Sequence, residues 1–300
     1  MSDYKLWIGG KAVEGVSDMG VINPATEEVF ATIARSDEAL VDAAIKSAKA
    51  AQKGWRKTSI ADRQAALIKI ADGLDARAEE MARVITMEQG KPMAESSAEV
   101  MYTGAFIRYF ATLDLPVEVL EDNEVRRVEM HRKPLGVVGC IIPWNFPLLI
   151  IAFKVPLALL AGNSIILKPS PTTPISAAIF AEICANALPA GVLNTVNDQN
   201  DLGGYITQHA GLAKVSFTGS TATGKKVMAS AAGTLKRLTL ELGGNDPAII
   251  LPDVNVAETA AKVYGAAFMN CGQVCLALKR AYVHEDIYEE MCEELGKLAS

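Results

Sequence analysis

Residues 1–35 show short segments and turn signals that are typical of strands joined by tight turns. The sequence Ile8-Gly9-Gly10-Lys11 is a hairpin signal, and Asn23-Pro24 marks a second turn. We therefore expect short strands and turns in this region.

After residue 35, the spacing of the apolar residues changes to that of helices. Leu40, Ala44 and Ala48 recur at helical spacing, and Ser36 is available as the N-terminal cap. Further helices are expected over residues 60–74, 76–88 and 94–113. Gly90-Lys91-Pro92 indicates a helix stop between the last two, because glycine and proline end helices.

From Pro134 onward, short apolar strands alternate with helical stretches. The expected strands cover residues 137–142, 164–168, 192–196, 214–217, 238–241 and 248–251. This order predicts an α/β fold with a Rossmann-like doubly wound parallel sheet. Such sheets bind ligands beyond the carboxyl ends of their strands. Four polar turns fall at those ends, beginning at Pro143, Lys168, Thr218 and Glu241.

The apolar stretch 135–167 has the length of a membrane span. A span needs about twenty apolar residues without interruption. Here the stretch is interrupted by Pro143, Asn145, Pro147, Lys154, Pro156 and Asn163. A strand, a helix and a second strand joined by turns fit it better, so no membrane partner is expected.

Residues 124–133 alternate charged positions with Val125, Val128 and Met130. One interpretation is an exposed strand whose unpaired edge a second subunit covers. A solvated hairpin is an equally good interpretation of these residues.

Composition narrows the class of protein. The chain has 300 residues, of which 50% are hydrophobic and 21% charged, and its net charge is −6. These values describe a soluble globular protein with enough chain for two domains. The acidic balance argues against nucleic acid as a partner, and the N-terminal sequence lacks the pattern of a secretory signal. Five cysteines without CxxC spacing indicate a reducing, cytoplasmic compartment and no metal site.

Two glycine-bearing motifs contain the candidate catalytic residues. Cys275 closes Phe-Met-Asn-Cys-Gly-Gln-Val-Cys, and Glu241 opens Glu-Leu-Gly-Gly-Asn thirty-four residues upstream. A catalytic thiolate needs a polar, partly open setting, which Gly272 and Gln273 supply. None of the three histidines lies in either motif, so Glu241 is the better base. A buried structural cysteine is the alternative interpretation of Cys275 taken alone.

Together these motifs resemble the active-site signatures of the aldehyde dehydrogenase superfamily, in the family's order from about Leu6 to the last residue. The resemblance implies that Cys275 attacks an aldehyde and that Glu241 activates the water that releases the product. Acyl-CoA-forming relatives generally lack this Glu, so the implied product is a carboxylic acid. Asn145, in Pro-Trp-Asn-Phe-Pro, would donate its side-chain amide to the oxyanion, together with the backbone N–H of Cys275.

The resemblance also implies a coenzyme site. Residues 217–224 join a strand to a helix, where N–H groups attract phosphate, although by themselves these residues favour a capped helix start. Within this turn Gly219 and Ser220 would face the coenzyme phosphates, and Lys168 would reach the adenosine ribose. The other expected coenzyme residues are Ile141, Ile142, Pro143, Trp144, Ser170 and Leu242.

The choice between NAD and NADP depends on two positions. Many NAD-preferring members have a Glu three positions after the strand-ending lysine, and this chain has Pro171 there. The missing carboxylate removes a repulsion against a 2′-phosphate. Asp198, in a neighbouring turn, either takes a ribose or repels a phosphate. We expect NAD, with NADP as the alternative.

The remaining cysteines have lesser expected roles. Cys271 lies four residues before Cys275 and would form an off-pathway disulfide with it under oxidation. Cys140, Cys184 and Cys292 are expected to be packing residues.

Family members run to roughly 480–500 residues, whereas this chain ends twenty-five residues after Cys275, inside a helical stretch at 286–298. We expect it to be part of a longer polypeptide that forms a homodimer or homotetramer. The expected division is 1–123 and 134–243 for the dinucleotide-binding domain, 124–133 for an oligomerisation strand and 244–300 for the start of a catalytic domain. The competing class is a non-catalytic binding or structural protein of the same fold, whose mark would be a lost Cys275, Glu241 or Asn145.

Overall fold

The computed structural model describes residues 3–300 and divides the chain into two compact units. The first unit ends at Glu241, and the second comprises Leu242–Ser300. Each unit has its own buried apolar cluster. The boundary falls two residues before the division that we expected after residue 243.

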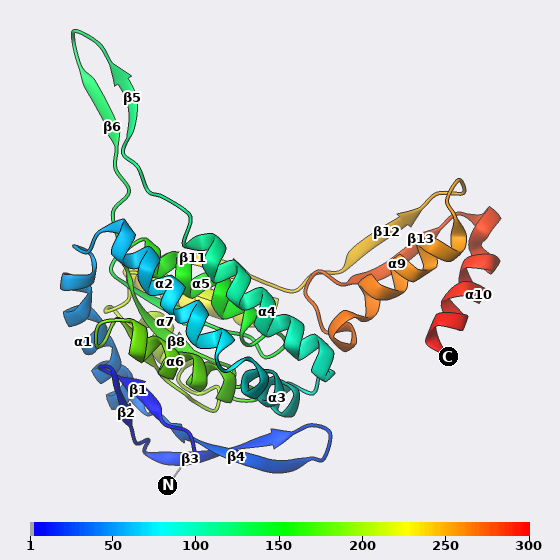
Figure 1. The fold of residues 1–300 in the computed structure, drawn as a ribbon, viewed down its shortest axis with the longest axis horizontal. Helices are drawn as coiled ribbons and strands as arrows, with labels where there is room; N and C mark the ends of the chain where they lie inside the picture. Colours follow the sequence, from blue (N-terminus) through cyan, green and yellow to red (C-terminus); the bar gives the residue numbers. More distant parts are fainter. Residues whose placement is uncertain (1–2) are drawn as a thin grey trace. The chain divides into compact units, whose positions relative to one another are not determined.

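Two antiparallel hairpins form the N-terminal part of the first unit (Figure 1). β1 (Leu6–Ile8) pairs with β2 (Lys11–Val13), and β3 (Ser17–Asn23) pairs with β4 (Glu28–Arg35). Gly9 and Gly10 make the first turn with φ of 65° and 74°, a left-handed backbone that glycine adopts without strain. Both predicted turns are confirmed.

Four helices follow: α1 (Glu38–Trp55), α2 (Ile60–Asp75), α3 (Ala78–Gln89) and α4 (Met93–Phe110). The expected helices are present, and α4 ends three residues earlier than the pattern suggested. The predicted cap of α1 was wrong. Asp37 accepts the bond from the Leu40 N–H at 2.9 Å, whereas the Ser36 hydroxyl accepts one from the Asn197 N–H. Gly90 ends α3 with φ of 93°, so the predicted helix stop is confirmed.

A five-stranded parallel sheet forms the centre of the first unit. Its strands are β7 (Val137–Ile141), β8 (Ser164–Lys168), β9 (Leu193–Thr195), β10 (Lys214–Thr218) and β11 (Arg237–Glu241), in the order β11-β10-β7-β8-β9. The chain extends the sheet from β7 to β9 and then returns to the other side of β7. The crevice between β7 and β10 is therefore the switch point at which doubly wound sheets bind ligands.

Helices cover both faces of this sheet, as the predicted doubly wound fold requires. α5 (Leu149–Leu160) and α6 (Ile175–Ala187) pack on the face that carries Ile165 and Leu167. Side chains alternate along a strand, so Ser164 faces the other way, where its hydroxyl donates to the Ala48 carbonyl of α1 at 2.9 Å. α7 (Gly203–Gln208) and α8 (Thr221–Ala231) complete the crossover connections.

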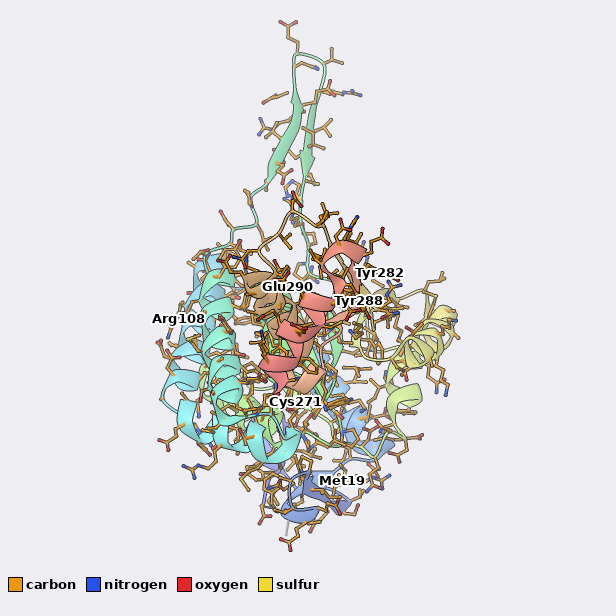
Figure 2. All side chains as sticks on the ribbon, turned by 90° about the vertical axis from the view of Figure 1, so that its right-hand side faces the viewer. Met19, Arg108, Cys271, Tyr282, Tyr288 and Glu290 are labelled. Carbon is orange, nitrogen blue, oxygen red and sulfur yellow. The ribbon has the colours of Figure 1, made fainter. Side chains whose placement is uncertain are left out.

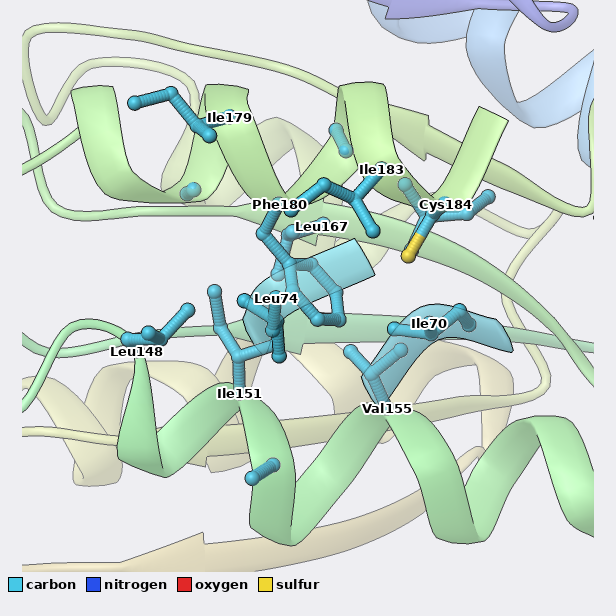
Figure 3. Close-up of a cluster of buried hydrophobic side chains, with 14 of the residues drawn as sticks. Ile70, Leu74, Leu148, Ile151, Val155, Leu167, Ile179, Phe180, Ile183 and Cys184 are labelled. Atoms are coloured by element: carbon cyan, nitrogen blue, oxygen red, sulfur yellow. The ribbon is translucent and has the colours of Figure 1, made fainter. Parts of the chain in front are cut away.

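The main apolar core lies between the sheet and helices α2, α5 and α6 (Figure 3). Phe180 of α6 is fully buried with Leu74 of α2 and Ile151 of α5. Leu148, which immediately precedes α5, belongs to the same cluster. Close packing of this kind fixes the start of α5 and the turn before it, which carries Asn145.

The stretch 135–167 forms β7, α5 and β8, which confirms the expected alternation of strand and helix. Among the described residues, no helix has the length and apolar character needed to cross a membrane.

β5 (Glu118–Asp122) and β6 (Arg127–Met130) form an antiparallel hairpin that extends away from the helices of the first unit in Figure 1. Residues 124–133 contain β6 and so belong to a hairpin, and the covering of its open edge by a second subunit stays a prediction. Each strand still has one open edge. Leu120 and Val125 on the hairpin are 63% and 91% exposed.

The second unit is a small α/β body. β12 (Asp246–Ile250) and β13 (Leu278–Val283) pair in parallel, and α9 (Val256–Phe268) and α10 (Tyr288–Ala299) pack with them. Its core contains Ile250, Ala260 and Met291. Tyr282 and Tyr288, labelled in Figure 2, remain about half exposed at 54% and 51%.

Candidate active site

The carboxyl ends of the central strands meet at one edge of the sheet. Ile141 of β7 is in register with Lys168 of β8 and with Phe217 of β10. Thr218 at the end of β10 is in register with Glu241 at the end of β11. The predicted coenzyme residues of the first unit and the predicted base therefore follow strands that end together, beside the switch point of the fold.

The turn after β10 has the features of a phosphate site. It leads into α8, an eleven-residue helix whose N-terminal N–H groups favour an anion. A Cβ at Gly219 would lie 2.5 Å from the Phe217 ring, so a side chain has no room there. Within residues 3–300, Oγ1 of Thr218 is buried without a hydrogen-bond partner, as expected of a hydroxyl that bonds a ligand. These residues fit the pyrophosphate of a dinucleotide.

Glu241 is the exposed last residue of β11. Its backbone carbonyl accepts a hydrogen bond from the Gly219 N–H at 3.0 Å. This bond links the predicted base to the phosphate turn through the backbone and leaves the carboxylate at the surface of the first unit. Leu242, a predicted coenzyme contact, follows as the first residue of the second unit.

Lys168 is buried at the end of β8. Its ammonium pairs with Oδ1 of Asp198 at 2.5 Å, and Oδ2 of Asp198 accepts a hydrogen bond from the Leu202 N–H at 2.9 Å. Asp198 is only 1% exposed, and among the described residues its Oδ1 forms the ion pair but no hydrogen bond. Lys168 balances the charge of Asp198, and a direct contact of Asp198 with a ribose or a phosphate stays a prediction. Pro171 follows in the same turn and is partly exposed.

Asn145 lies in the turn between β7 and α5. Its backbone carbonyl accepts a hydrogen bond from the Lys91 ammonium at 2.8 Å, and that ammonium lies 3.9 Å from the centroid of the Phe146 ring. Lys91 also pairs with Glu99 at 2.5 Å, and both side chains are fully buried. This pair is not predicted from the sequence, where Lys91 indicates only a helix stop.

The other predicted coenzyme residues around this turn differ in exposure. Ile141 and Ile142 are buried at 8% and 2%, and Trp144 is 45% exposed. Pro143 stands between them and is partly exposed. In the next turn the Ser170 hydroxyl forms a hydrogen bond with that of Thr172 at 2.9 Å.

Cys275 follows an irregular turn in the second unit. Asn270 and Cys271 both have left-handed backbones, with φ of 53° and 54°, and Gly272 follows at 75°. The Asn270 side-chain amide stabilises the turn by donating to the Gln273 carbonyl at 3.2 Å. Left-handed angles cost a non-glycine residue roughly 1–2 kcal/mol, and such strain persists most often where function requires a particular shape.

Lys279 fixes the backbone on the other side of the thiol. Its ammonium donates to the carbonyls of Val274, Cys275 and Ala277 at 2.8, 3.1 and 3.3 Å. The Cys275 carbonyl also approaches Gly244 so closely that a Cβ there would lie 2.7 Å from it. The Cys275 backbone is thus held within the second unit while the residue itself is exposed.

The remaining cysteines fall into two groups. Cys140 and Cys184 are buried, and burial raises the pKa of the Cys140 thiol to about 12 and that of Cys184 well above its usual value. Both stay protonated packing residues, as expected. Cys292 is exposed on α10, so its assignment as a packing residue was wrong. Cys271 is exposed as well (Figure 2), and its disulfide with Cys275 stays a prediction.

A cavity of about 890 Å³ lies on the α5 face of the sheet, where the Lys154 ammonium donates to the Ser216 hydroxyl at 2.8 Å. Burial lowers the pKa of Lys154. None of the predicted catalytic or coenzyme residues lines this cavity, so it is separate from the strand-end site. In the part of the chain that the structure describes, no cluster of three or more His, Cys, Asp or Glu is arranged to hold a metal ion.

Comparison with known proteins places the chain in a family. Residues 11–300 match the model of the aldehyde dehydrogenase family. The chain belongs to this family. It is 40% identical to phenylacetaldehyde dehydrogenase of Pseudomonas fluorescens over 309 aligned residues, which include 98% of the chain and 61% of that protein.

Solved structures of the family have the same fold. An NADP-dependent enzyme of E. coli matches with a TM-score of 0.96 and 32% identity, over 99% of this chain and 63% of that one. PnpE in complex with nicotinamide adenine dinucleotide matches with a TM-score of 0.95 and 34% identity, over 99% and 62%. The chain therefore spans about three fifths of the length of these relatives.

Proposed function

We propose that the full-length protein oxidises an aldehyde to a carboxylic acid with NAD(P)+. The observation that carries the proposal is the joint presence of Cys275, Glu241 and Asn145 in a member of the aldehyde dehydrogenase family, on turns that hold each backbone in place. A non-catalytic member would be expected to lose at least one of them.

The first half of the reaction acylates Cys275. Its thiolate forms a carbon–sulfur bond to the aldehyde carbonyl, and the carbonyl electron pair moves onto oxygen. The side-chain amide of Asn145 and the backbone N–H of Cys275 donate to this oxyanion. Bound NAD(P)+ would supply the hydride acceptor. When the C=O bond re-forms, the carbon loses its hydride and remains on sulfur as a thioester.

The second half releases the acid. Glu241 takes a proton from a water molecule, whose oxygen attacks the thioester carbon. The carbon–sulfur bond then breaks and Cys275 leaves as thiolate. The exposed side chain of Glu241 at the end of β11 suits this task, because a general base for water must be reachable by water.

The coenzyme would bind along the strand ends. Thr218, Gly219 and Ser220 would hold the pyrophosphate, and Lys168, aligned by Asp198, would contact the adenosine ribose. The other residues proposed to contact the coenzyme are Ile141, Ile142, Pro143, Trp144, Ser170 and Leu242. We propose NAD as the preferred coenzyme, with NADP accepted because no carboxylate stands at Pro171.

The coenzyme proposal is tested by Pro171→Glu. The added carboxylate should repel the 2′-phosphate and lower kcat/KM for NADP, while kcat/KM for NAD holds or improves, since like charges in a desolvated site can cost several kcal/mol. Both constants are measured in the full-length enzyme with one aldehyde at fixed concentration. An unchanged ratio would show that residue 171 does not face the ribose.

The chemical roles are tested by rapid mixing of the full-length enzyme. Glu241→Gln should slow thioester hydrolysis by about 10²–10⁴ while hydride transfer continues, giving a burst of NADH near one equivalent per site and then slow turnover. Cys275→Ala should give neither burst nor turnover yet bind the coenzyme normally. Wild-type turnover in Glu241→Gln rejects the base assignment, and activity in Cys275→Ala rejects the nucleophile.

The hairpin β5–β6 would join subunits of a homodimer or homotetramer. Its open strand edges and the exposed Leu120 and Val125 are features that a partner strand would cover.

A further inference from the structure

Glu99 of α4 contacts the start of α5 with one carboxylate oxygen and Lys91 with the other. Its Oε1 accepts hydrogen bonds from the Leu148 and Leu149 N–H groups at 2.9 and 3.0 Å. These are donors at the N-terminus of α5, where no side chain of the helix itself provides a cap. Its Oε2 accepts from the Lys91 ammonium at 2.5 Å.

Lys91 extends this network to the residue proposed to bind the oxyanion. Its ammonium donates to the Asn145 carbonyl and lies over the Phe146 ring. One ion pair therefore holds both ends of the turn, at Asn145 and at Leu148. Neither Lys91 nor Glu99 has an exposed side chain, and hydrogen bonds are stronger in such a low-dielectric setting than in water.

We propose that the Lys91–Glu99 pair is a positioning device for the Asn145 amide during acylation of Cys275. The inference rests on the proposed function, because it assigns the pair a role in the same oxyanion site. Lys91 fixes the backbone of Asn145, so the side chain that carries the amide extends from a fixed backbone position. An oxyanion donor must be in place before the charge develops, since reorganisation during the reaction forfeits its stabilisation.

A second buried glutamate provides a matched control. Glu88 of α3 accepts hydrogen bonds from the Ile175 and Ser176 N–H groups at 2.7 and 3.1 Å, at the start of α6. It caps a helix as Glu99 does, but the turn before α6 carries none of the three proposed catalytic residues. If Glu99 only caps its helix, its substitution should affect acylation independently of Asn145, as that of Glu88 should.

The kinetic test is a double-mutant cycle in the full-length enzyme. Lys91→Met combined with Glu99→Gln removes both charges together, so that no charge is left buried alone. Asn145→Ala should slow acylation about 10²–10³-fold, and the charge-free pair should slow it up to roughly 10²-fold through misplacement. If the pair acts through Asn145, the triple variant is no slower than Asn145→Ala. The proposal is overturned if the rate decreases caused by Asn145→Ala and by the charge-free pair multiply in the triple variant. It is also overturned if the charge-free pair acylates at the wild-type rate.

Glu88→Gln is tested in the same cycle, and any decrease that it causes in the acylation rate should multiply with the decrease caused by Asn145→Ala. Amide hydrogen exchange supplies a readout that does not depend on activity. Exchange at Leu148 and Leu149 should accelerate in Glu99→Gln and stay unchanged in Glu88→Gln. Unchanged exchange in Glu99→Gln overturns the inference even if the enzyme is active. A wild-type acylation rate in Asn145→Ala would instead reject the oxyanion role, and thus the proposed function.

Discussion

The turns that carry Asn145 and Cys275 are held by the same kind of contact in different surroundings. In each, a lysine ammonium donates to the carbonyl of the proposed catalytic residue, Lys91 to Asn145 and Lys279 to Cys275. Lys91 is 1% exposed and paired with a buried carboxylate. Lys279 is an exposed residue that donates to three neighbouring carbonyls.

The difference follows from the cost of burying charge. A buried ammonium costs several kcal/mol unless an anion and hydrogen bonds compensate it, whereas an exposed one keeps water around it. The Asn145 turn is therefore coupled to helices α3 and α4 and to the core of its unit. The Cys275 turn is held by the Lys279 hydrogen bonds, by the close approach of Gly244 and by its left-handed segment. These two settings suit the proposed roles, since an oxyanion donor must be fixed and a nucleophile must be accessible.

The largest effect is expected from breaking the buried pair on one side. Lys91→Met leaves Glu99 charged and unpaired in the interior, so the free energy of unfolding should fall by about 3–5 kcal/mol. Adding Glu99→Gln removes that charge and should restore a substantial part of the loss. Denaturant unfolding of the wild type and both variants measures this. A single variant as stable as the wild type would mean that the pair is not buried as described.

A smaller effect is expected at Glu88, which has no ion pair among the described residues. Burial raises the pKa of Glu88 from 4.5 to about 7. Between these pH values the unfolded chain releases the proton and the folded protein retains it, so this group's stabilising contribution is complete below pH 4.5 and lost as the pH rises to 7. At about 1.4 kcal/mol per pKa unit, this shift in pKa corresponds to roughly 3 kcal/mol in the free energy of unfolding.

Glu88→Gln isolates the pH-dependent contribution of Glu88 to stability, because glutamine resembles the protonated carboxyl and does not titrate. From pH 4.5 to 7.5, wild-type stability should fall relative to that of the variant by roughly 3 kcal/mol. Unfolding free energies of both proteins over this range measure the difference. Parallel curves would contradict a raised pKa at Glu88.

Local patterns predicted the fold and the positions of the motifs well, because each depends on residues close in sequence. The apolar strands of the parallel sheet, the stop at Gly90 and the start of a helix in the turn after β10 are of this kind. The supporting contacts were not predictable. Lys91 and Asn145 are fifty-four residues apart, and neither residue type indicates its partner. The Ser36 cap failed because the hydroxyl bonds the Asn197 N–H, which only the folded chain brings near.

The smallest effect on stability is expected at Lys279. Lys279→Met removes three hydrogen bonds made by an exposed ammonium, whose net contribution is small because water also solvates that ammonium, so the free energy of unfolding should fall by about 1 kcal/mol. Acylation of Cys275 in the full-length enzyme should nevertheless slow by roughly tenfold, because the backbone that carries the thiol and its N–H donor is less fixed. Denaturant unfolding and the rate of the NADH burst measure the two effects. Lys262→Met, on the exposed side of α9 in the same unit, is the matched control and should change neither. A loss of stability as large as that of Lys91→Met would remove the contrast between the two turns, and an unchanged burst rate would show that the Cys275 turn keeps its shape without Lys279.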